Sequence, residues 1–561
     1  MNETIDLNAL ALFGASGAAL LWGLAQLRQR IELSLAKHRS LAGHPRTARR
    51  LAAWLPRYAY TEDQMLVVDG APEEIVALRR AALNRLVHSC QVKFANSLAC
   101  NQEAAAGLSD LQFVSAYRTP FQFQNMVDKG LKIASFVQST SGVTVTDLDG
   151  NVFYDLTGSY GVNLFGNDFY KHSIDQGARR VGELGPVLGA YHPVVLDNVQ
   201  RLKRISGMDE VSFHMSGTEA VMQAVRLARY HSGRNKVVRF CGAYHGWWGD
   251  VQPGIGNPVA ARDTFTLSEM AAGTLRVLRQ RHDIACILVN PLQALHPNAA
   301  AASDSSLLDS SRLASFDKPR YTAWLQELRK ICDDKGIALI FDEVFVGFRL
   351  APGGAQAYFG VMADLVTYGK TLGGGLPVGV VCGKRQWMKR FRDNAPADIC
   401  FARGTFNSHP YVMGAMNVFL QYLDSAAAQA MYHDLDNTWN SRAARLNQRL
   451  AAAQLPLQVA NMSSIWTVLY TRPACYNWLF QHYLRLEGLA LSWVGTGRII
   501  FSLNYTEADF EAVTERFVRA AQAMQQDGWW WNAGQSNQDI KRRILRELIR
   551  ARFGFPPEVQ T

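Results

Sequence analysis

Two apolar runs near the middle of the chain lead into an acid and an amine. Residues 337–341 are continuously apolar and precede Asp342, and a second short run, residues 365–369, precedes Lys370. Runs that are apolar on both faces are typical of strands in a mostly parallel sheet covered by helices. Because such sheets place ligands at their strand ends, the sequence predicts an α/β fold with Asp342 and Lys370 at the mouths of buried strands.

An amine and a carboxylate placed in this way suit pyridoxal 5'-phosphate (PLP) chemistry. A lysine amine can form a Schiff base with the cofactor. A carboxylate can hold a proton on the pyridine nitrogen, so that the ring accepts electrons from the substrate. The alternative is an ordinary strand edge on which Asp342 and Lys370 are merely solvated. These two segments alone do not separate the two interpretations.

Residues 213–229 begin with small polar residues and continue with apolar residues at helical spacing. Ser216, Gly217 and Thr218 stand where this helix is expected to begin. Free N–H groups, hydroxyls and the positive end of the helix dipole make such a position a seat for phosphate. The commoner meaning of the pattern is a capping box between Ser216 and Glu219. The two interpretations are compatible.

A β-branched run from residue 237 ends in glycine and is followed by Tyr244 and His245. Tyr244 could lie flat on a pyridine ring, where offset stacking contributes roughly 0.5–1.5 kcal/mol. As an isolated aromatic residue it would more often belong to the core.

Five motifs occur in the order found in a known family. The chain is therefore similar to class III, fold-type I PLP-dependent aminotransferases over roughly residues 143–524. It resembles glutamate-1-semialdehyde aminomutase and the aminotransferase domains of polyketide and peptide assembly lines. The motifs are Ser-Gly-Thr-Glu-Ala at 216–220, Tyr-His-Gly at 244–246, Asp-Glu-Val-x-x-Gly-Phe-Arg at 342–349, Tyr-Gly-Lys-x-x-Gly-Gly-Gly-x-Pro-x-Gly at 368–379 and Gly-Thr-Phe-Asn-Ser-His-Pro at 404–410.

The resemblance implies a role for each matching residue. Lys370 would be the Schiff-base lysine and proton shuttle, Asp342 would pair with the pyridine nitrogen, and Tyr244 would stack on the ring. Residues 216–218 would hold the phosphate. Thr405 would reach the phosphate of the neighbouring subunit, which implies a homodimer.

Further residues match less directly. Tyr160 corresponds to an aromatic residue near the substrate, and His245 is a weaker candidate for the cofactor pocket. Family members usually carry glutamate where this chain has Asn290, so Asn290 is a candidate for altered geometry on the substrate side.

A second departure concerns the substrate. The aminomutase holds its substrate carboxylate with an arginine in a Ser-Pro-x-Arg segment, and residues 121–132 contain no such motif, although Arg118 lies nearby. We therefore expect transfer from a small amino donor to an aldehyde or ketone on a lipid- or polyketide-like chain in secondary metabolism, free or bound to an acyl carrier protein. The alternatives are a 2,1-aminomutase of the glutamate-1-semialdehyde type and an inactive PLP-fold scaffold.

The N-terminus carries a run without charge. Residues 7–27 contain no ionisable side chain, and basic residues follow. About 20 apolar residues can span a bilayer, and the basic flank would place the catalytic part in the cytoplasm, anchored to the inner or plasma membrane. A helix packed on the protein or lying in the membrane interface is an equal alternative.

Composition excludes several classes of protein. The net charge of +10 invites nucleic-acid binding, but no motif supports it. The eight cysteines form no Cys-x-x-Cys pair, so neither a metal site nor a disulfide framework is indicated.

The pattern along the chain suggests six parts. A polar segment around residues 299–315 is expected to be a mobile surface insertion, and residues 541–552 form a basic amphipathic helix that follows Trp529, Trp530 and Trp531. Packing of that helix on its own domain is favoured over contact with a membrane. The parts are a possibly membrane-associated helix (1–30), a helical extension (31–115), an N-terminal segment of a small domain (116–195), a large PLP-binding domain (196–408), the C-terminal small domain with strands and helices (409–525) and a basic tail (526–561).

Overall fold

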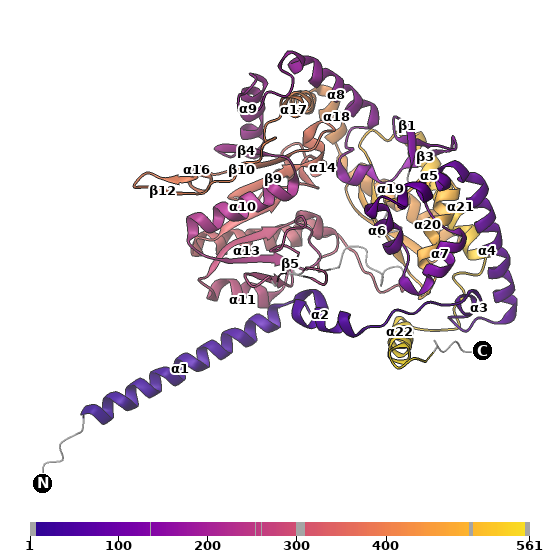
Figure 1. The fold of residues 1–561 in the computed structure, drawn as a ribbon, viewed down its shortest axis with the longest axis horizontal. Coiled ribbons are helices and arrows are strands. Elements are labelled where there is room, and N and C mark those ends of the chain that lie inside the picture. Colours follow the sequence, from indigo (N-terminus) through magenta and orange to yellow (C-terminus); the bar gives the residue numbers. More distant parts are fainter. Residues whose placement is uncertain are drawn as a thin grey trace, which may run out of the picture.

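The fold was analysed in a computed structural model. The structure describes residues 7–134, 136–252, 254–257, 259, 261–298, 309–492 and 497–555. Two lobes lie side by side, one built on a large sheet and the other on two small sheets (Figure 1).

The large lobe contains a seven-stranded sheet in the order β4-β10-β9-β8-β7-β5-β6. Only β10 runs against its neighbours, so the predicted mostly parallel sheet is confirmed. The strands are β4 (Glu210–His214), β5 (Lys236–Phe240), β6 (Thr264–Leu267), β7 (Ile284–Val289), β8 (Ala338–Asp342), β9 (Leu365–Gly369) and β10 (Gly379–Gly383).

Both faces of this sheet are buried, because successive strand residues point to opposite sides. Leu288 and Ile340 pack with the apolar side of α10. Their neighbours Ile287 and Leu339 belong to the core on the opposite side. The helices of this lobe are α8 (Asn167–Val181), α9 (Val194–Ser206), α10 (Gly217–Ser232), α11 (Ala272–Gln280), α13 (Lys318–Lys335), α14 (Gly347–Leu350), α15 (Gly354–Phe359), α16 (Arg385–Met388), α17 (Pro410–Leu423) and α18 (Ala426–Tyr432), and a hairpin joins β11 (Phe391–Arg392) to β12 (Ala395–Ile399).

The second lobe brings together segments from both ends of the catalytic region. Strand β15 (Leu489–Ala490) pairs in parallel with β3 (Val152–Asp155), although the two lie far apart in the sequence. The predicted small domain is likewise assembled from two segments, but its exact boundaries stay a prediction. Its other elements are β1 (Val137–Ser141), β2 (Thr144–Asp147), β13 (Leu457–Met462), β14 (Ile465–Tyr470), β16 (Ile499–Ile500), α19 (Leu435–Ala452), α20 (Phe480–Leu486) and α21 (Glu507–Gln526).

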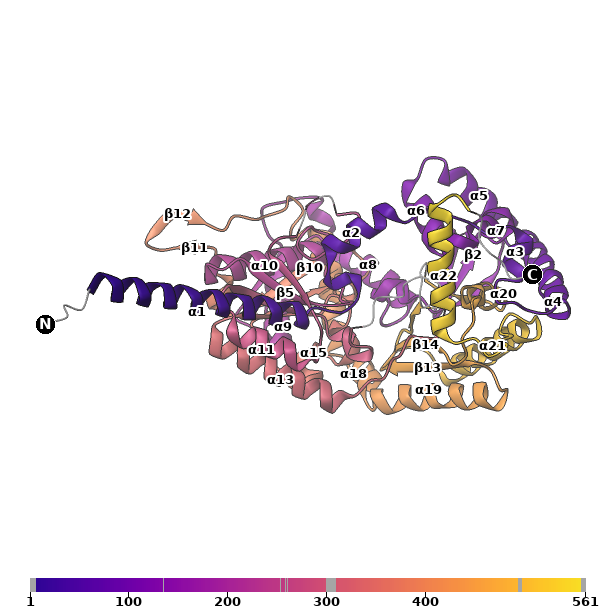
Figure 2. The ribbon, with the colours of Figure 1, turned by 90° about the horizontal axis from the view of Figure 1, so that it is seen from below.

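The N-terminal helix α1 (Leu7–Ala36) projects from the large lobe (Figure 2). Its last turn is held at the sheet edge, where the Ala36 carbonyl accepts a hydrogen bond of 2.9 Å from the Ser268 N–H. Within the described residues, none of the helices combines the length and apolar character needed to cross a membrane. The predicted membrane span over residues 7–27 is thus not supported, and contact of α1 with a membrane surface stays a prediction.

Helices α3 to α7 cover the second lobe (Figure 1). Helix α2 lies against the large lobe, where the Arg49 side chain donates a hydrogen bond of 3.3 Å to the Asn257 carbonyl. Helix α4 contacts both α7 and α20. The helical character predicted for residues 31–115 is confirmed. The helices are α2 (Pro45–Trp54), α3 (Glu62–Leu66), α4 (Glu73–Lys93), α5 (Ala95–Ala105), α6 (Ser109–Tyr117) and α7 (Gln124–Gly130).

The C-terminal helix α22 (Asn537–Arg552) packs on its own chain. The buried Glu547 carboxylate accepts hydrogen bonds of 2.7 Å and 2.6 Å from the hydroxyls of Tyr58 and Tyr60. Trp529 and Trp530, which precede this helix, are fully buried. These contacts confirm the packed helix and leave the two tryptophans no part in a membrane interface.

The predicted surface insertion is partly internal. Residues 299–308 of this segment lie outside the described residues. Beyond them the chain turns inward, because Asp309 is buried and its carbonyl accepts a hydrogen bond of 3.1 Å from the Asn477 amide. The expectation of a segment lying entirely on the surface is therefore wrong for Asp309, whereas Ser311 is exposed.

Candidate active site

Asp342 and Lys370 lie at the same edge of the large sheet. Asp342 is the last residue of β8, Lys370 directly follows β9, and the two strands are parallel neighbours with Asp342 opposite Thr367. The buried Asp342 carboxylate accepts hydrogen bonds of 3.3 Å from the Thr367 hydroxyl and 3.2 Å from the Val344 N–H. The predicted convergence of the acid and the amine is thus present in the fold.

The environment of Lys370 favours a neutral, nucleophilic amine. Burial lowers the pKa of Lys370, while the charge of Asp342 acts in the opposite direction and Arg498 adds to the lowering. Lys370 also has a positive φ of 48°, an uncommon conformation that tends to occur at functional sites. A lysine with a depressed pKa keeps its lone pair at lower pH than a solvated one, as a Schiff-base lysine requires.

The Lys370 side chain lies close to the loop of residues 158–161. A Cβ added to Gly161 would lie 2.8 Å from the Phe345 ring and 3.3 Å from Cδ of Lys370, and Gly161 has a φ of +95°. Only glycine tolerates this approach and this backbone conformation together. Tyr160, immediately before it, has a φ of 57° and a side chain that is half exposed. A turn with positive φ at Tyr160 thus precedes the glycine that approaches the Lys370 side chain.

His245 binds Asp342 directly. The His245 Nδ1 lies 2.7 Å from Oδ2 of Asp342, and both side chains are buried. Burial lowers the pKa of His245 more than the carboxylate raises it, so the ring is neutral and its Nδ1–H donates to the carboxylate. Its buried Nε2 has no partner among the described residues. The sequence predicts His245 only as a general pocket residue, whereas the structure shows that it orients Asp342.

The start of α10 lies against the same strand ends. A Cβ added to Gly217 would come within 2.5 Å of the Val344 side chain, and one added to Gly246 would come within 2.6 Å of the Thr218 hydroxyl. The helix start, the loop after β5 and the end of β8 are therefore in direct contact. The first N–H groups of a helix have no partner inside it and favour an anion.

Ser216 caps this helix. Its hydroxyl accepts a hydrogen bond of 3.2 Å from the Glu219 N–H, and the Glu219 carboxylate accepts one of 2.9 Å from the Met215 N–H. The Ser216 half of the predicted capping box is thus present, whereas the Glu219 carboxylate binds the N–H of Met215 and not that of Ser216. The Ser216 hydroxyl can still donate its own proton, so capping leaves the predicted phosphate seat possible.

The ring of Tyr244 is exposed, and its backbone carbonyl is hydrogen-bonded. Its side chain is 58% exposed, and burial of its hydroxyl together with the charge of Asp342 raises its pKa. The Tyr244 carbonyl accepts a hydrogen bond of 3.1 Å from the Asn290 amide, whose oxygen accepts one of 3.2 Å from the Leu292 N–H. Asn290, predicted as a substrate contact, is thus occupied with backbone groups and supports the Tyr244 loop.

Exchange of Asn290 for aspartate should weaken this support. The new carboxylate can still accept from Leu292 but would face the Tyr244 carbonyl, so an acceptor would oppose an acceptor. We expect a loss of about 1–3 kcal/mol in stability and faster release of the cofactor. Thermal unfolding and dialysis against buffer measure the two effects. The exposed Asn235→Asp variant is the control, and equal behaviour of both variants would contradict the role assigned to Asn290.

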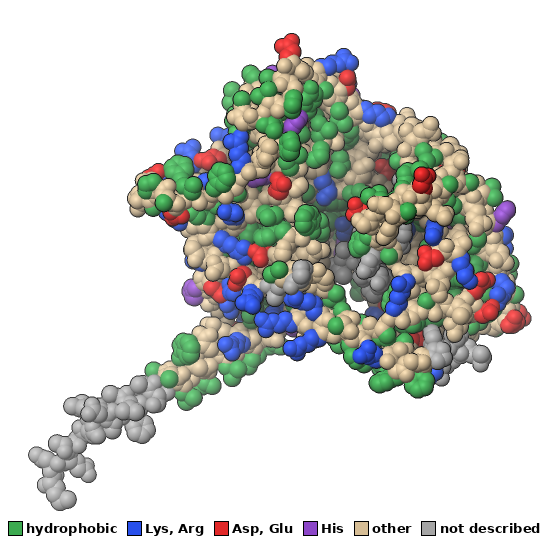
Figure 3. Space-filling view, viewed as in Figure 1, with side chains coloured by type: hydrophobic (Ala, Val, Ile, Leu, Met, Phe, Trp, Pro, Cys, Tyr) green, Lys and Arg blue, Asp and Glu red, His purple; other side chains and the backbone are tan. Residues whose placement is uncertain are grey.

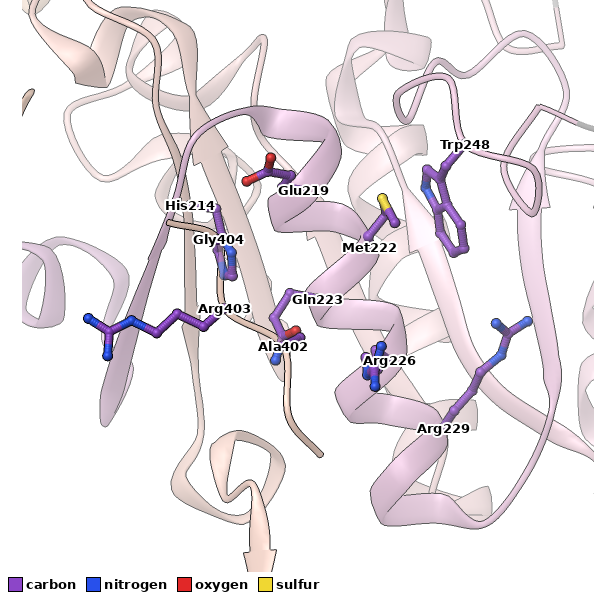
Figure 4. Close-up of a pocket in the computed structure, with 10 residues that line it drawn as sticks. All are labelled: His214, Glu219, Met222, Gln223, Arg226, Arg229, Trp248, Ala402, Arg403 and Gly404. Atoms are coloured by element: carbon purple, nitrogen blue, oxygen red, sulfur yellow. The ribbon is translucent and has the colours of Figure 1, made fainter. Parts of the chain in front are cut away.

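Thr405 lies on an exposed loop at the outer side of α10. A cavity of about 330 Å³ lies between this helix and the loop (Figure 4). It is not the Lys370 site, because neither Lys370 nor Asp342 lines it. The lining residues are His214, Glu219, Met222, Gln223, Arg226, Arg229, Trp248, Ala402, Arg403 and Gly404.

The sequence did not point to four residues at or next to the Lys370 site, namely Phe345, Arg498, Arg312 and His296. The Phe345 ring has the Lys370 Nζ 5.3 Å from its centre and the Arg498 guanidinium carbon 5.6 Å away. Arg498 interacts electrostatically with Arg312, and both do so with His296. Phe345 occupies an unspecified position of the 342–349 motif, and the two arginines and His296 stand in no recognised motif, so only their positions in space connect them to the site.

Comparison with known proteins agrees with this geometry. The model of the class-III aminotransferase family matches residues 126–249 and 317–521. The chain therefore belongs to the class-III aminotransferases, and it is a PLP-dependent enzyme with the PLP-transferase fold.

Two relatives that match much of the chain share the same name. Glutamate-1-semialdehyde 2,1-aminomutase of Nitratidesulfovibrio vulgaris (strain DP4) is 30% identical over 396 residues, which is 68% of this chain and 90% of that protein. The enzyme of the same name from Geotalea daltonii is 29% identical over 64% of this chain and 84% of its own.

Solved structures show the same fold. A glutamate-1-semialdehyde aminomutase from Pseudomonas aeruginosa PAO1 has a TM-score of 0.63 at 18% identity and covers 81% of this chain and 99% of its own. An omega-transaminase from Sphaerobacter thermophilus has a TM-score of 0.59 at 24% identity and covers 70% of this chain and 92% of its own.

Proposed function

We propose that this enzyme moves an amino group between an amino donor and a carbonyl compound at the sheet edge formed by Asp342 and Lys370. The observation that carries the proposal is a buried amine of lowered pKa placed near a buried carboxylate that a neutral histidine orients. When bound, PLP supplies an aldehyde that condenses with amines and a ring that accepts electrons.

The residues present fit this cofactor. The N–H groups of Gly217 and Thr218 at the start of α10 would hold its phosphate, and the exposed Tyr244 ring would cover its ring. Asp342 would hold the pyridine proton, and the hydrogen bond from His245 would fix the carboxylate in place. Lys370, once free, would carry the proton of the substrate's Cα to the carbon that receives it.

The first test is spectroscopic. Addition of amines to the holoenzyme should change its near-visible absorption, and a keto or aldehyde product should appear in the mass spectrum. An absorption that no amine changes would contradict the proposal and would favour the inactive scaffold, which the intact pair of Asp342 and Lys370 argues against.

A second candidate function is an intramolecular aminomutase. It is favoured by the relatives named glutamate-1-semialdehyde 2,1-aminomutase. The two reactions differ in their products, because transfer releases a free keto product from the donor and mutation does not. Incubation with glutamate-1-semialdehyde, with and without a second carbonyl compound, distinguishes them.

The narrower substrate suggested by the sequence, a lipid- or polyketide-like carbonyl in secondary metabolism, rested mainly on the missing carboxylate clamp. The structure instead places Arg498 beside Lys370. That argument is thereby weakened, and delivery by an acyl carrier protein has no separate support.

We also propose that the active unit is a homodimer. Exposed aromatic side chains surround the loop that carries Thr405 and the loop after β5, as a covered interface would require. They are Tyr244, Trp247, Phe401 and Phe406.

Thr405→Ala tests this arrangement. Loss of a hydrogen bond to a partner's cofactor phosphate should weaken PLP binding by roughly 10- to 100-fold, the effect of one charge-assisted bond of about 1.5–3 kcal/mol. Light scattering should still report a dimer, and Thr405→Ser should retain the cofactor. A monomer in solution, or unchanged PLP affinity in the alanine variant, would contradict the assignment.

A further inference from the structure

The projecting helix α1 exposes apolar side chains. Every side chain from Ala18 to Arg28 is exposed, and among the described side chains of α1 only Ala36 is buried. The exposed large apolar side chains of this helix are Leu20, Leu21, Trp22, Leu24, Leu27, Ile31 and Leu35. A contiguous apolar surface of this kind marks a place where a protein meets another molecule or a membrane.

Helix α2, which follows α1, is amphipathic and basic. Its Ala48 is buried, whereas Leu51, Trp54 and the next residue, Leu55, are exposed. Residues 33–61 contain six lysines or arginines and no aspartate or glutamate. Helices that combine basic residues with exposed Trp and Leu side chains are typical of the interface between a membrane and water.

A basic cavity lies where the ends of α1 and α2 meet the edge strand β6. Its volume is about 450 Å³. Four cations line it, namely Lys37, Arg46, Arg49 and Arg262. The acid next to Arg262 in the sequence, Asp263, is paired with Lys236 instead. Because a lipid phosphate accepts several charge-assisted hydrogen bonds, this cavity suits such a group.

Helix α22 adds a third segment next to α2. The Arg552 guanidinium carbon lies 5.7 Å from the centre of the Trp54 ring, so the ends of the two helices adjoin. The buried residues of α22 are Ile540 and Glu547. The exposed residues at α22 and directly after it include the apolar Leu545, Ile549, Phe553 and Phe555 and the basic Lys541, Arg542, Arg546 and Arg552. The helix thus packs through one side and presents an apolar and basic side to solvent.

The three helices share one face of the molecule. Helices α1, α2 and α22 follow the lower border in Figure 1 and lie foremost in Figure 2, which views the molecule from below. Figure 3 shows Lys and Arg side chains gathered where the projecting helix meets the large lobe, and hydrophobic side chains along that helix. One extended surface can therefore contact all three helices at once.

We propose that the face formed by α1, α2 and α22 binds the surface of an anionic membrane, with a lipid phosphate in the cavity lined by Lys37 and Arg46. The exposed apolar side chains enter the interface, where burial of their area stabilises binding. The cations meet the negative charge of the lipids, and each adds to the attraction near the surface. This contact requires no helix that crosses the bilayer, and it does not depend on the proposed amino-transfer function.

Other occupants fit this face less well. A two-fold interface with a second copy would bring the same patch of both subunits together, so cations would face cations at a cost in affinity. A nucleic acid would pair with the cations through its phosphates but would leave the exposed Leu and Trp side chains uncovered. An anionic membrane surface satisfies both the charged and the apolar side chains.

The test uses the full-length holoenzyme and two kinds of lipid vesicle. In sedimentation, vesicles of equal parts phosphatidylglycerol and phosphatidylcholine should bind the protein at least about 10-fold more tightly than vesicles of phosphatidylcholine alone. An increase in NaCl from about 0.05 M to about 0.5 M should weaken binding to the anionic vesicles by a similar factor, because salt screens the attraction between charges. Equal binding to both kinds of vesicle, or binding to neither, would refute the inference.

Charge reversal tests the cavity. Arg46→Glu should weaken binding to the anionic vesicles about 10-fold, because it removes one favourable charge and adds an unfavourable one, and Arg46→Gln should cause a smaller loss. The matched control is Lys203→Glu, at an exposed position of α9 near the opposite border of the molecule in Figure 1. It changes the net charge equally and should alter the affinity less than about 2-fold. Equal losses in Arg46→Glu and Lys203→Glu would contradict the proposed cavity.

Exchange of aromatic side chains tests the apolar contact. Trp22→Ser, Trp54→Ser and Phe553→Ser should each weaken binding to the anionic vesicles at least about 5-fold, because each removes a large apolar side chain from the interface. Leu196→Ser is the matched control, since Leu196 is 63% exposed on α9. All these positions are exposed, so the midpoint of thermal unfolding should stay close to that of the parent. A loss confined to Trp22→Ser would overturn the face of three helices.

Three results would assign the face to another occupant and would overturn the inference. Binding of duplex DNA without binding of vesicles would indicate a nucleic acid. A change of oligomeric state in Trp22→Ser, without binding of vesicles by the parent, would indicate a second copy of this chain. Binding of glycerol 3-phosphate in free solution, again without binding of vesicles, would indicate a soluble anion. Turnover of an amine donor in solution should be the same in all these variants, so failure of the amino-transfer function is a separate outcome.

Discussion

Lys370→Ala is expected to lower turnover by at least about 10³-fold, because one change removes both the nucleophile and the group that moves the proton. The near-visible absorption of the bound cofactor should shift at the same time. The buried position of Lys370 and its lowered pKa are the physical basis of this expectation. Absorption spectra and single-turnover rates with an amine donor measure the two effects.

The control is the substitution of a lysine outside the site. Lys203 lies exposed on α9, so Lys203→Ala should leave both the spectrum and the rates unchanged. Addition of a small primary amine such as methylamine should restore part of the activity of Lys370→Ala, because a free amine can move the same proton. Near-parent transamination by Lys370→Ala would refute the central assignment.

Asp342→Asn should reduce turnover on the order of 10²-fold or more while leaving the fold largely in place. The amide keeps the size of the side chain and can still accept from the Val344 N–H. It cannot hold a full charge beside the pyridine nitrogen, so the ring would lose its proton and accept electrons poorly. Rates of the half-reaction with an amine donor, compared with thermal unfolding, separate chemistry from stability.

Asp364→Asn should have the opposite effects to Asp342→Asn on stability and on turnover. Asp364 is also buried, precedes β9 and binds Arg329 and Lys384 at 2.8 Å and 2.7 Å. It lies at the far end of the strand from Lys370, about 20 Å away at the usual rise per residue. Its exchange should lower stability, because two cations lose their partner, with turnover per folded molecule unchanged. Equal kinetic effects in the two variants would remove the electron-sink role of Asp342.

Local patterns accounted for most of the large lobe. Continuous apolar runs predicted buried strands, and the polar start of residues 213–229 predicted a helix that begins at Gly217. These signals depend on residues that are neighbours in the sequence, so they can be recognised without knowledge of tertiary contacts. The same applies to Asp342 and Lys370, because each is fixed by the end of its own strand.

Other interpretations depend on contacts in space. The predicted substrate role of Asn290 stays a prediction, and the structure adds that its amide donates to the Tyr244 carbonyl 46 positions away. Residues 7–27 have a length suited to a span, yet no described helix is apolar enough to cross a membrane. For the C-terminal helix the favoured prediction, packing on its own domain, is confirmed, and Trp529 and Trp530 before it are buried.

The sequence by itself determined the strands, the helix start and the two residues proposed for the chemistry, because each depends on a short stretch with its own hydrophobic period. Tertiary structure alone decided which side chains meet across long separations. His245 reaches Asp342 from 97 positions away, and Arg312 reaches the Gly497 carbonyl from 185 positions away. The energies of such contacts depend on burial and on distances between strand ends, and neither quantity can be read from residues that are adjacent in the chain.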